Sequence, residues 1–392
     1  MQEEKTEKKI FVNLSNVPLG TGAAGIGQYA MNLLEGFRQI GRLHALQLLV
    51  NSSDADLVRS LFPEAGIRIV PAMIPDTLPG IRRYQSSWRV ELLRSFLRER
   101  AGIPWMLRKE KTGLLFHPFN AMFIHVSNKI PTVVTVHDLF YRNFPEAHSR
   151  KMRLLLNLCY RTIIHRPRQL IVPSAFVRGD IMKYYPGVDR NKVRVIANPI
   201  LIRDHPQHEI PVPRPYLLSV NSIQAHKNLK TLILAQAILE KLIPHHLVLV
   251  GQGSKEEEGA LTALIHQTGV KRVIRTGYVN EAQRNDLYRH ASCFISPSLH
   301  EGFGMTPIEA ALCNTPILVT RETSLPEVTR EMAAYYEPAD DPRALAEKIH
   351  QMLNNPPGLD ELHRISRVYR QCYDPKKIAR AYDLLFQCVM NP

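Results

Sequence analysis

The sequence predicts two doubly wound α/β domains, each built on a parallel sheet with helices on both faces. The chain has 392 residues, which is the length of two ordinary domains that each bury a core of their own. Short apolar runs bounded by turn residues recur along it and indicate buried parallel strands. Several of these runs end in glycines that lead into a helical pattern, as at the ligand-binding edge of such sheets.

The composition is that of a globular, intracellular protein. Hydrophobic residues make up 45% and charged residues 22% of the chain. No apolar run approaches the ~20 residues that span a bilayer, and the charged start Met1–Lys9 lacks the apolar core of a signal peptide. The five cysteines are an odd number without C-x-x-C spacing. We therefore expect a cytoplasmic protein with reduced thiols, without disulfides and without a zinc site.

The positive charge is confined to the first half of the chain. Residues 1–200 contain 29 Lys and Arg against 15 Asp and Glu, whereas residues 201–392 contain 21 of each. This excess predicts an anionic partner. Patterns of zinc fingers, RNA-recognition motifs and basic zippers are missing, so nucleic acid is not expected. An anionic membrane surface or a phosphorylated acceptor fits the charge better.

The first strand and helix enclose a glycine-rich loop. Residues 10–14 form a predicted strand, and apolar residues on one face indicate a helix over 26–40. Between them, Gly20-x-Gly22-x-x-Gly25 satisfies the dinucleotide fingerprint, which makes an NAD-dependent oxidoreductase one alternative. Against it, residues 15–19 separate the strand from the glycines, and the next strand, 46–50, ends in Asn51 rather than in an acid for a ribose.

Asp54-Ala-Asp56 offers the spacing of a metal-binding D-x-D motif. The simpler interpretation is that Ser52, Ser53 and Asp54 provide an N-cap for a helix that runs to Phe62. We favour the cap, and we expect no metal site in the chain.

Residues 81–111 are basic and amphipathic. Large apolar residues recur at four-residue spacing, and arginines fill the remaining positions: Tyr84, Trp88, Leu92 and Phe96, then Arg82, Arg83, Arg89, Arg94, Arg98 and Arg100. One interpretation is a core-packed helix with a solvated arginine face. The other is docking on a membrane interface, for which Arg82, Arg83, Trp88, Arg94 and Arg98 are the candidate residues.

Two successive strands of the first half end in histidines. The runs 114–117 and 131–138 both indicate buried parallel strands, and they end at His117 and at His137-Asp138. Residues at the carboxyl ends of such strands point into the ligand crevice. A single strand-end histidine is more often structural, but two on successive strands favour a place in the site.

The second half repeats the pattern of strands and glycine loops. Residues 203–215 carry four prolines and little periodicity, so we place the domain boundary there. Strand 216–220 is followed by Lys227 at a helix start, where the dipole disfavours a cation unless an anion lies between them. Further strands end at Gly251 and before Tyr278-Val279.

The densest signal is the stretch from Ser298 to Leu312. Gly302 and Gly304 allow a close approach of backbone to a ligand. Thr306 is the expected N-cap of a helix, with Pro307 at its first position and Glu309 completing a capping box. Capping could be all that Glu309 does. Glu301 has no such duty, so the stretch places a carboxylate beside a helix N-terminus that favours anions.

In the form Glu301-Gly-Phe-Gly-Met-x-x-x-Glu309, this stretch resembles the retaining GT-B glycosyltransferases of family 4, the glycosyl transferases group 1. The resemblance spans nearly the whole chain and implies two domains facing across a cleft. It places Glu301 by the sugar and phosphate of the donor and Glu309 on the ribose. Val136-His137-Asp138-Leu139 is similar to the mannosyltransferase-like members, in which the histidine contacts the acceptor or the transferred sugar.

The resemblance also implies a donor site of residues from several loops. It assigns Lys227 to the donor diphosphate, whereas Ser222 or His226 replaces the second cation that is common nearby, with Arg321 as a speculative substitute. The donor-binding residues that we expect are Gly25, Gly27, Ser222, Lys227, Gly251, Tyr278, Val279, Glu301, Gly302, Phe303, Gly304, Met305, Thr306 and Glu309. Glu301, His137 and Lys227 are the expected catalytic residues.

We therefore expect domains at residues 1–205 and 206–373 and a helix, 374–392, that returns to the first domain. The expected reaction moves a hexose from a nucleotide sugar, with GDP-mannose favoured, to a lipid-linked or glycan acceptor, with retention and without a metal or other cofactor. A nucleotide-sugar hydrolase or epimerase on the same fold and a non-catalytic scaffold at a lipid surface remain open alternatives.

Overall fold

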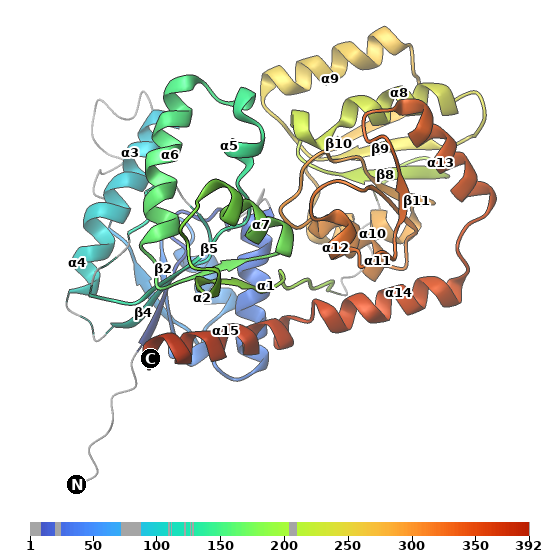
Figure 1. The fold of residues 1–392 in the computed structure, drawn as a ribbon. Helices are drawn as coiled ribbons and strands as arrows, with labels where there is room; N and C mark the ends of the chain where they lie inside the picture. Colours follow the sequence, from blue (N-terminus) through green and yellow to red (C-terminus); the bar gives the residue numbers. More distant parts are fainter. Residues whose placement is uncertain are drawn as a thin grey trace. The chain divides into compact units, whose positions relative to one another are not determined.

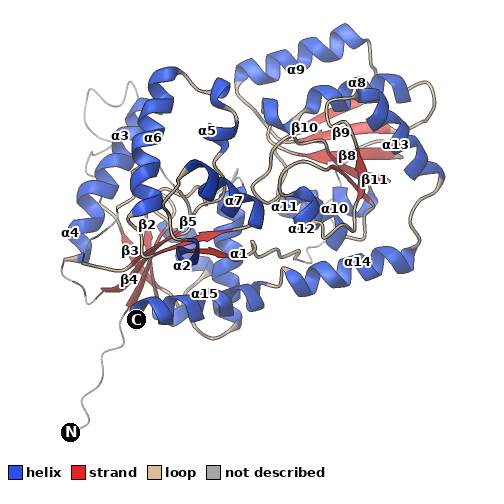
Figure 2. Ribbon diagram, viewed as in Figure 1, coloured by secondary structure: helices blue, strands red, loops and turns tan. Residues whose placement is uncertain are grey.

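The structure is a computed structural model that describes residues 9–19, 25–71, 88–108, 110, 112–120, 123–125, 127, 129–203 and 210–391. The chain divides into two compact units, Met1–Pro199 with Pro375–Pro392, and Ile200–Asp374. Each unit is a parallel sheet with helices packed on it (Figure 1; Figure 2). The predicted pair of doubly wound α/β domains is thereby confirmed. The expected boundary region at 203–215 lies partly outside the described residues.

The first sheet has seven strands in the order β3-β2-β1-β4-β5-β6-β7, and the paired strands are parallel. Its strands are β1 (Lys9–Asn13), β2 (Leu46–Val50), β3 (Gly66–Ile69), β4 (Thr112–His117), β5 (Thr132–Thr135), β6 (Gln169–Val172) and β7 (Val193–Val195). The strand order reverses between β1 and β4. At such a switch point two neighbouring strands send their following loops to opposite faces of the sheet, which opens a crevice at the carboxyl edge.

The helices of the first unit include the last helix of the chain. They are α1 (Gly25–Gln39), α2 (Ala55–Leu61), α3 (Trp88–Leu97), α4 (Ile103–Leu107), α5 (Phe140–Asn143), α6 (Arg150–His165), α7 (Ala175–Tyr184) and α15 (Pro375–Met390), with short 3-10 or π turns at Leu43–Ala45, Arg98–Gly102, Pro145–Ala147 and Arg190–Lys192. Helix α15 packs against α1, where a side chain at Gly36 would collide with the Pro375 carbonyl. The Tyr29 and Tyr382 hydroxyls, 2.7 Å apart, join the same two helices.

The second sheet has six strands in the order β10-β9-β8-β11-β12-β13, again parallel. They are β8 (Tyr216–Val220), β9 (His246–Val250), β10 (Val273–Gly277), β11 (Cys293–Ser296), β12 (Ile317–Thr320) and β13 (Ala334–Tyr336). This is the 3-2-1-4-5-6 order of dinucleotide-binding folds, with its switch point between β8 and β11. Strands β8, β11 and β12 are almost completely buried, as central strands covered on both faces must be.

The helices of the second unit cover both faces of this sheet. They are α8 (Leu229–Leu239), α9 (Lys255–Thr268), α10 (Glu281–His290), α11 (Met305–Leu312), α12 (Leu325–Val328), α13 (Pro342–Asn354) and α14 (Leu359–Cys372), with a 3-10 turn at Ala225–Lys227. The core under α8, α9 and α13 is built mainly from leucine, isoleucine and valine side chains. None of the helices in the described parts of either unit has the length and apolar content that crossing a bilayer requires.

Candidate active site

The candidate site lies at the switch point of the second sheet. Lys227 follows β8 and Glu301 follows β11, and these two strands are hydrogen-bonded neighbours. Because both loops leave the carboxyl edge of a parallel sheet, residues that are 74 positions apart in sequence meet there. The tertiary fold thus joins two of the residues that the sequence singles out separately.

Lys227 and Glu301 form a largely buried ion pair. The Nζ of Lys227 donates to Oε1 of Glu301 at 2.7 Å, and the exposed fractions of the two side chains are 16% and 13%. Burial raises the pKa of Glu301, but the Lys227 ammonium and a hydrogen bond from Ser298 outweigh it, so the pKa lies below its ordinary value. Glu301 is therefore ionised at neutral pH. An ammonium carries three N–H donors, so this pairing leaves Lys227 the capacity to bind a second anion.

The two loops that carry this pair are tied together by backbone and amide contacts. The Leu299 N–H donates to the His226 carbonyl at 2.8 Å. Asn228 has a left-handed φ of 53°, and its Nδ2 donates to the Pro297 carbonyl at 3.1 Å and to the Ala339 carbonyl at 2.8 Å. These contacts fix the separation of Lys227 and Glu301 before any ligand binds.

The glycine loop, residues 301–304, turns directly into helix α11. Gly304 is the N-cap residue at φ 84°, a backbone conformation that glycine adopts without strain. The prediction that Thr306 caps this helix is wrong, because α11 begins at Met305 and has no side-chain cap. The positive φ of Gly304 lets the chain enter the helix earlier, which puts Thr306 and Pro307 inside the first turn.

Glu309 is directed toward helix α10, not toward Thr306, so the expected capping box does not form. The Tyr288 hydroxyl donates to Oε2 of Glu309 at 3.0 Å, and Nε of Arg284 lies 3.5 Å from the same oxygen. Glu309 is 3% exposed. Burial lowers the pKa of Arg284, but Glu309 together with Tyr288, Glu281 and Cys313 raises it by more, so the guanidinium stays charged. The buried carboxylate is thus held by a cation and a hydroxyl.

The remaining expected donor residues of this unit occupy different environments. Ser222 is exposed and donates to Gln224 at 3.3 Å. Gly251, at φ 134°, has no room for a side chain, because a Cβ there would lie 1.9 Å from the Asn221 carbonyl oxygen. Tyr278 is 47% exposed and Val279 half-buried, whereas Phe303 is buried edge-on against Tyr373. Gly302, Met305 and Thr306 are half-buried beside Glu301.

In the first unit, Gly25 and Gly27 form the first turn of α1. Gly20 and Gly22 lie outside the described residues. Strand β1 ends at Asn13 and α1 begins at Gly25, so the strand does not lead straight into the helix as the dinucleotide fingerprint requires. The oxidoreductase alternative is not favoured by this geometry.

His137 lies just past β5 and is held as a neutral ring. Its Nε2 donates to the Pro118 carbonyl at 2.8 Å, its backbone N–H donates to Asn120 at 3.2 Å, and the Tyr29 ring stands edge-on at 4.7 Å. Burial lowers the pKa of His137 despite the Pro118 carbonyl and Asp138. Nδ1 is the ring nitrogen that this hydrogen bond does not use.

His117 is enclosed in a polar network at the switch point of the first sheet. It is completely buried, its Nε2 donates to the His125 carbonyl at 2.9 Å, and its Nδ1 accepts from Asn13 at 3.1 Å. Glu99 accepts from Asn13 at 2.7 Å and from the His125 N–H at 2.8 Å. Burial lowers the pKa of His117 to about 3 and raises that of Glu99 to about 7. With both nitrogens engaged, His117 braces the loops here.

The expected amphipathic stretch 81–111 is not one helix. It contains α3, a π-helical segment at Arg98–Gly102 and α4, whereas Arg82 and Arg83 and the side chain of Trp88 lie outside what the structure describes. The expected solvated arginine face is wrong for Arg94 and Arg98, which are half-buried. Nε of Arg98 donates to Asn16 at 2.9 Å. Leu93 and Phe96 are exposed instead, at 50% and 38%.

The D-x-D pair and Arg321 are both engaged elsewhere. Asp54 accepts from Asn51 at 2.9 Å, and Asp56 pairs with Arg59 at 2.8 Å on an exposed helix face. Arg321 pairs with Glu331 at 2.9 Å and lies over the Tyr335 ring. Within the described ranges, no three His, Cys, Asp or Glu side chains are grouped so as to hold a metal ion.

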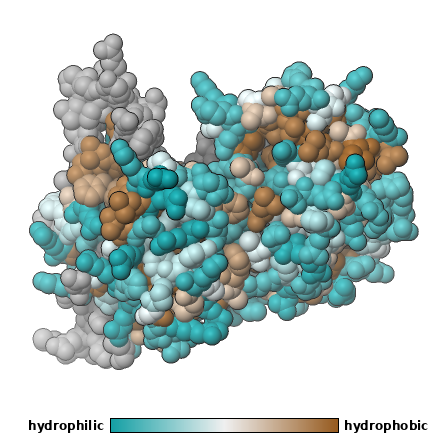
Figure 3. Space-filling model, turned by 45° about the horizontal axis from the view of Figure 1, so that its top comes forward, coloured by the Kyte–Doolittle hydropathy of each residue, from teal (hydrophilic) through white to brown (hydrophobic). Residues whose placement is uncertain are grey.

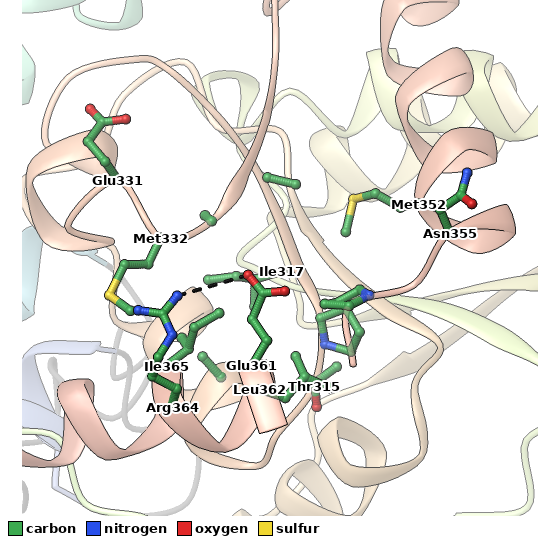
Figure 4. A pocket seen from close by; sticks show the side chains of 15 residues that line it. Thr315, Ile317, Glu331, Met332, Met352, Asn355, Glu361, Leu362, Arg364 and Ile365 are labelled. Atoms are coloured by element: carbon green, nitrogen blue, oxygen red, sulfur yellow. Dashed lines mark ion pairs between the residues drawn. The ribbon is translucent and has the colours of Figure 1, made fainter. Parts of the chain in front are cut away.

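A cavity of about 400 Å³ lies at the opposite, amino edge of the second sheet. Figure 4 shows Met332, Met352, Leu362 and Ile365 around it, with the Glu361–Arg364 ion pair at its rim. It is lined where β12 and β13 begin, whereas Lys227 and Glu301 follow the ends of their strands. This cavity is therefore separate from the candidate site.

Several residues around the site escaped the sequence reasoning. Arg284 and Tyr288 are four positions apart on α10, so they share a helix face, but helical spacing alone did not indicate Glu309 as their partner. Ser298, Thr323 and Ser324 contact Glu301 and carry no local signature.

Both halves of the chain match known protein families. Residues 23–202 match the family described as Glycosyltransferase Family 4, and residues 202–370 match the family described as Glycosyl transferases group 1. The chain is 25% identical to O-antigen chain mannosyltransferase B of Escherichia coli over 86% of its own length and 89% of the relative's. It is 26% identical to O-antigen chain mannosyltransferase RfbU of Salmonella typhimurium, over 85% and 88%.

Solved structures share the fold. Sucrose-phosphate synthase from Thermosynechococcus elongatus superposes with a TM-score of 0.74 at 17% identity, covering 98% of this chain and 99% of that one. WaaG, a glycosyltransferase involved in lipopolysaccharide biosynthesis, gives 0.65 at 16% identity, covering 94% and 98%. With two parallel-sheet domains and family matches that together run from residue 23 to 370, this chain belongs to the GT-B glycosyltransferases of family 4, the glycosyl transferases group 1.

Proposed function

We propose that this glycosyltransferase moves a hexose, with mannose favoured, from a nucleotide sugar to a hydroxyl of a lipid-linked or glycan acceptor, with retention at the anomeric carbon and without a metal ion. The observation that carries the proposal is the buried Lys227–Glu301 pair at the switch point of the second sheet, beside the N-terminus of α11. Ligands of doubly wound folds bind at this point.

The pair provides both charges that a nucleotide-sugar donor requires. In the proposed reaction, the bond between the anomeric carbon and the phosphate oxygen breaks, and a bond to the acceptor oxygen forms on the same face. The departing phosphate takes the proton of the acceptor hydroxyl. Lys227 and the backbone N–H groups after Gly304 stabilise the charge that develops on this phosphate. Glu301, which is ionised because it pairs with Lys227, accepts hydrogen bonds from hydroxyls of the donor sugar and thereby orients the sugar.

Glu309 suits the ribose of the donor nucleotide. Its Oε2 is held by Tyr288 and Arg284, so that the carboxylate is already oriented when the ligand arrives. Its second oxygen is then the acceptor for ribose hydroxyls in this proposal. In this proposal Tyr278, which is exposed and directly follows β10, contacts the nucleobase.

Mannose as the transferred sugar rests on the relatives. Both full-length relatives reported above are named as mannosyltransferases of an O-antigen chain, and a third, 34% identical over 143 residues, is named Serotype-specific mannosyltransferase WbdA of Escherichia coli. That third match covers 35% of this chain. GDP-mannose is therefore the donor that we propose, and a lipid-linked or growing glycan chain is the proposed acceptor.

A panel of nucleotide sugars tests the donor. Binding of GDP-mannose, UDP-glucose and UDP-galactose is measured by calorimetry, and turnover is followed with and without oligosaccharide acceptors carrying a lipid. We expect GDP-mannose to bind tightest and to be consumed only with an acceptor. Consumption without any acceptor would instead indicate a hydrolase or epimerase, and tighter binding of a UDP-sugar would overturn the choice of donor.

We further propose that the first unit docks on an anionic membrane through α6. Leu154 and Leu158, one helical turn apart, are 64% and 58% exposed. Helix α6 also carries Arg150, Lys151, Arg153 and Arg161 and contains no acidic residue. Figure 3 shows hydrophobic patches that interrupt the hydrophilic surface. Exposed leucines ringed by basic residues suit an interface of acyl chains and anionic headgroups.

Sedimentation with liposomes tests this docking. We expect the bound fraction to rise with anionic lipid content and to fall with salt. Replacing Leu154 and Leu158 by Gln should reduce binding severalfold, whereas the matched change Leu242→Gln, at a 61% exposed leucine of the second unit, should not. Equal effects of the two changes, or no sedimentation at any lipid charge, would leave a soluble acidic acceptor as the partner of the basic half.

A further inference from the structure

The backbone around Glu301 is held by three hydroxyls from the end of β12 and the loop that follows it. Oγ1 of Thr320 donates to the Ser298 carbonyl at 2.7 Å. The Glu301 N–H donates to Oγ1 of Thr323 at 3.0 Å, and Oγ of Ser324 donates to the Glu301 carbonyl at 2.8 Å. We call Thr320, Thr323 and Ser324 the hydroxyl brace. It engages both peptide groups of Glu301, so the Cα of this residue is fixed from the neighbouring loop.

Thr323 makes its contact from a strained backbone. Its φ is 54°, in the left-handed region where a β-branched residue is rare and strained. Such strain persists only where the surroundings impose it, and it gathers at functional sites. Glycine would occupy the same conformation without strain, but it would not offer a hydroxyl to Glu301.

The same segment supports the glycine loop itself. A Cβ on Gly304 would lie 2.7 Å from Cδ2 of Leu325, so the loop rests directly on the first residue of α12. Leu325 and Ser324 are fully buried. The segment 323–325 therefore contacts the glycine loop at both ends, at Glu301 and at Gly304.

Lys227 holds the carboxylate of Glu301, whereas the hydroxyl brace holds its backbone. A carboxylate that orients a sugar must keep its place to within about 0.5 Å, and its own side-chain torsions cannot ensure this if its Cα moves. The two sets of contacts therefore act on different parts of one residue.

We propose that Thr323 is a positioning residue of glycosyl transfer, which acts through the main chain of Glu301. This inference rests on the proposed role of Glu301. Removal of the Thr323 hydroxyl should lower turnover and leave donor binding nearly unchanged, because the diphosphate and ribose contacts of Lys227 and Glu309 stay in place.

Three substitutions at one position separate the hydroxyl from the strain. Thr323→Val keeps the shape and the β-branched strain but removes the acceptor of the Glu301 N–H; we expect kcat to fall about tenfold, the value of one hydrogen bond, with KM for the donor within twofold. Thr323→Ser restores the hydroxyl and should restore kcat to within about twofold. Thr323→Gly removes the hydroxyl, so it should lower kcat. Because it also relieves the backbone strain, the melting temperature should stay level or rise.

The matched control is Thr329→Val, which removes a buried hydroxyl that donates to the Leu325 carbonyl at 2.7 Å in the same segment. Its kcat should stay near wild type. If Thr323→Val and Thr323→Gly keep wild-type kcat, or if they raise KM alone, the proposal for Thr323 is overturned. Glu301→Gln is measured alongside. Full activity of Glu301→Gln would overturn both roles, whereas loss in Glu301→Gln with full activity in the Thr323 variants would overturn only the inference.

Discussion

The Lys227–Glu301 pair can be tested by a double-mutant cycle. Lys227→Met removes the ammonium that lies 2.7 Å from a carboxylate whose side chain is 13% exposed. Breaking a buried pair from one side costs about 3–5 kcal/mol because a charge is left uncompensated. Partial exposure reduces this, so we expect the urea unfolding free energy to fall by roughly 2–3 kcal/mol. The double variant Lys227→Met/Glu301→Gln should recover most of the loss.

The pH dependence of the stability of Lys227→Met provides an independent test of the ion pair. In the wild type, the lowered pKa of Glu301 contributes stability above the ordinary carboxyl pKa, and this stability is lost as the pH falls through the lowered pKa. Without Lys227, burial dominates and the pKa of Glu301 rises. The deficit of Lys227→Met should therefore shrink as the solution is acidified and Glu301 takes up a proton.

The control cycle uses Arg364→Met and Glu361→Gln, a pair at 4.0 Å whose side chains are 62% and 55% exposed. An exposed pair of this kind contributes less than about 0.5 kcal/mol. A coupling between Lys227 and Glu301 as small as in this control would refute the buried ion pair and, with it, the ionised state that we assign to Glu301.

Glu309→Gln should raise the Kd for the nucleotide about tenfold with little change in kcat, because a ribose contact is equal in ground and transition states. Glu301→Gln should instead lower kcat more than donor affinity. The reverse pattern in steady-state kinetics and calorimetry would exchange the two roles. Turnover should survive EDTA, since Lys227 is proposed to neutralise the leaving phosphate; loss with EDTA and rescue by Mn²⁺ would contradict this. Burial raises the pKa of Glu99 to about 7. The contribution of Glu99 to stability is therefore full below the ordinary carboxyl pKa of 4.5, and up to about 3 kcal/mol of it is lost as the pH rises through 7. Glu99→Gln should remove this pH dependence from the unfolding free energy measured between pH 4.5 and 8.

Much of the architecture is encoded in local sequence. The apolar runs at 46–50, 216–220 and 246–250 coincide with strands β2, β8 and β9. Such strands are buried on both faces, so most of their residues are apolar, and their ends are visible as polar or glycine residues. Glu301 is equally visible, because a carboxylate at a strand end beside two glycines has few structural explanations.

The predictions that were wrong concern residues whose role depends on which neighbours they meet in the folded chain. Thr306 has the chemistry of an N-cap, but the left-handed backbone of Gly304 starts α11 before it. Arg94 and Arg98 look like a solvated face, yet both are half-buried and Arg98 is drawn to Asn16. Local pattern states what a residue can do, and tertiary neighbours decide which option is realised.

By itself, the sequence determined the strands, the two doubly wound sheets and the single residues Lys227, Glu301 and Glu309, because burial and backbone conformation leave a local record in residue type. Only the tertiary structure decided the partners: Lys227 for Glu301, Arg284 and Tyr288 for Glu309, and Thr323 for the Glu301 backbone. These contacts join residues 21 to 74 positions apart. The physical reason is that a hydrogen bond or an ion pair depends on distance in space, which the order of strands in the sheet sets and local sequence does not record.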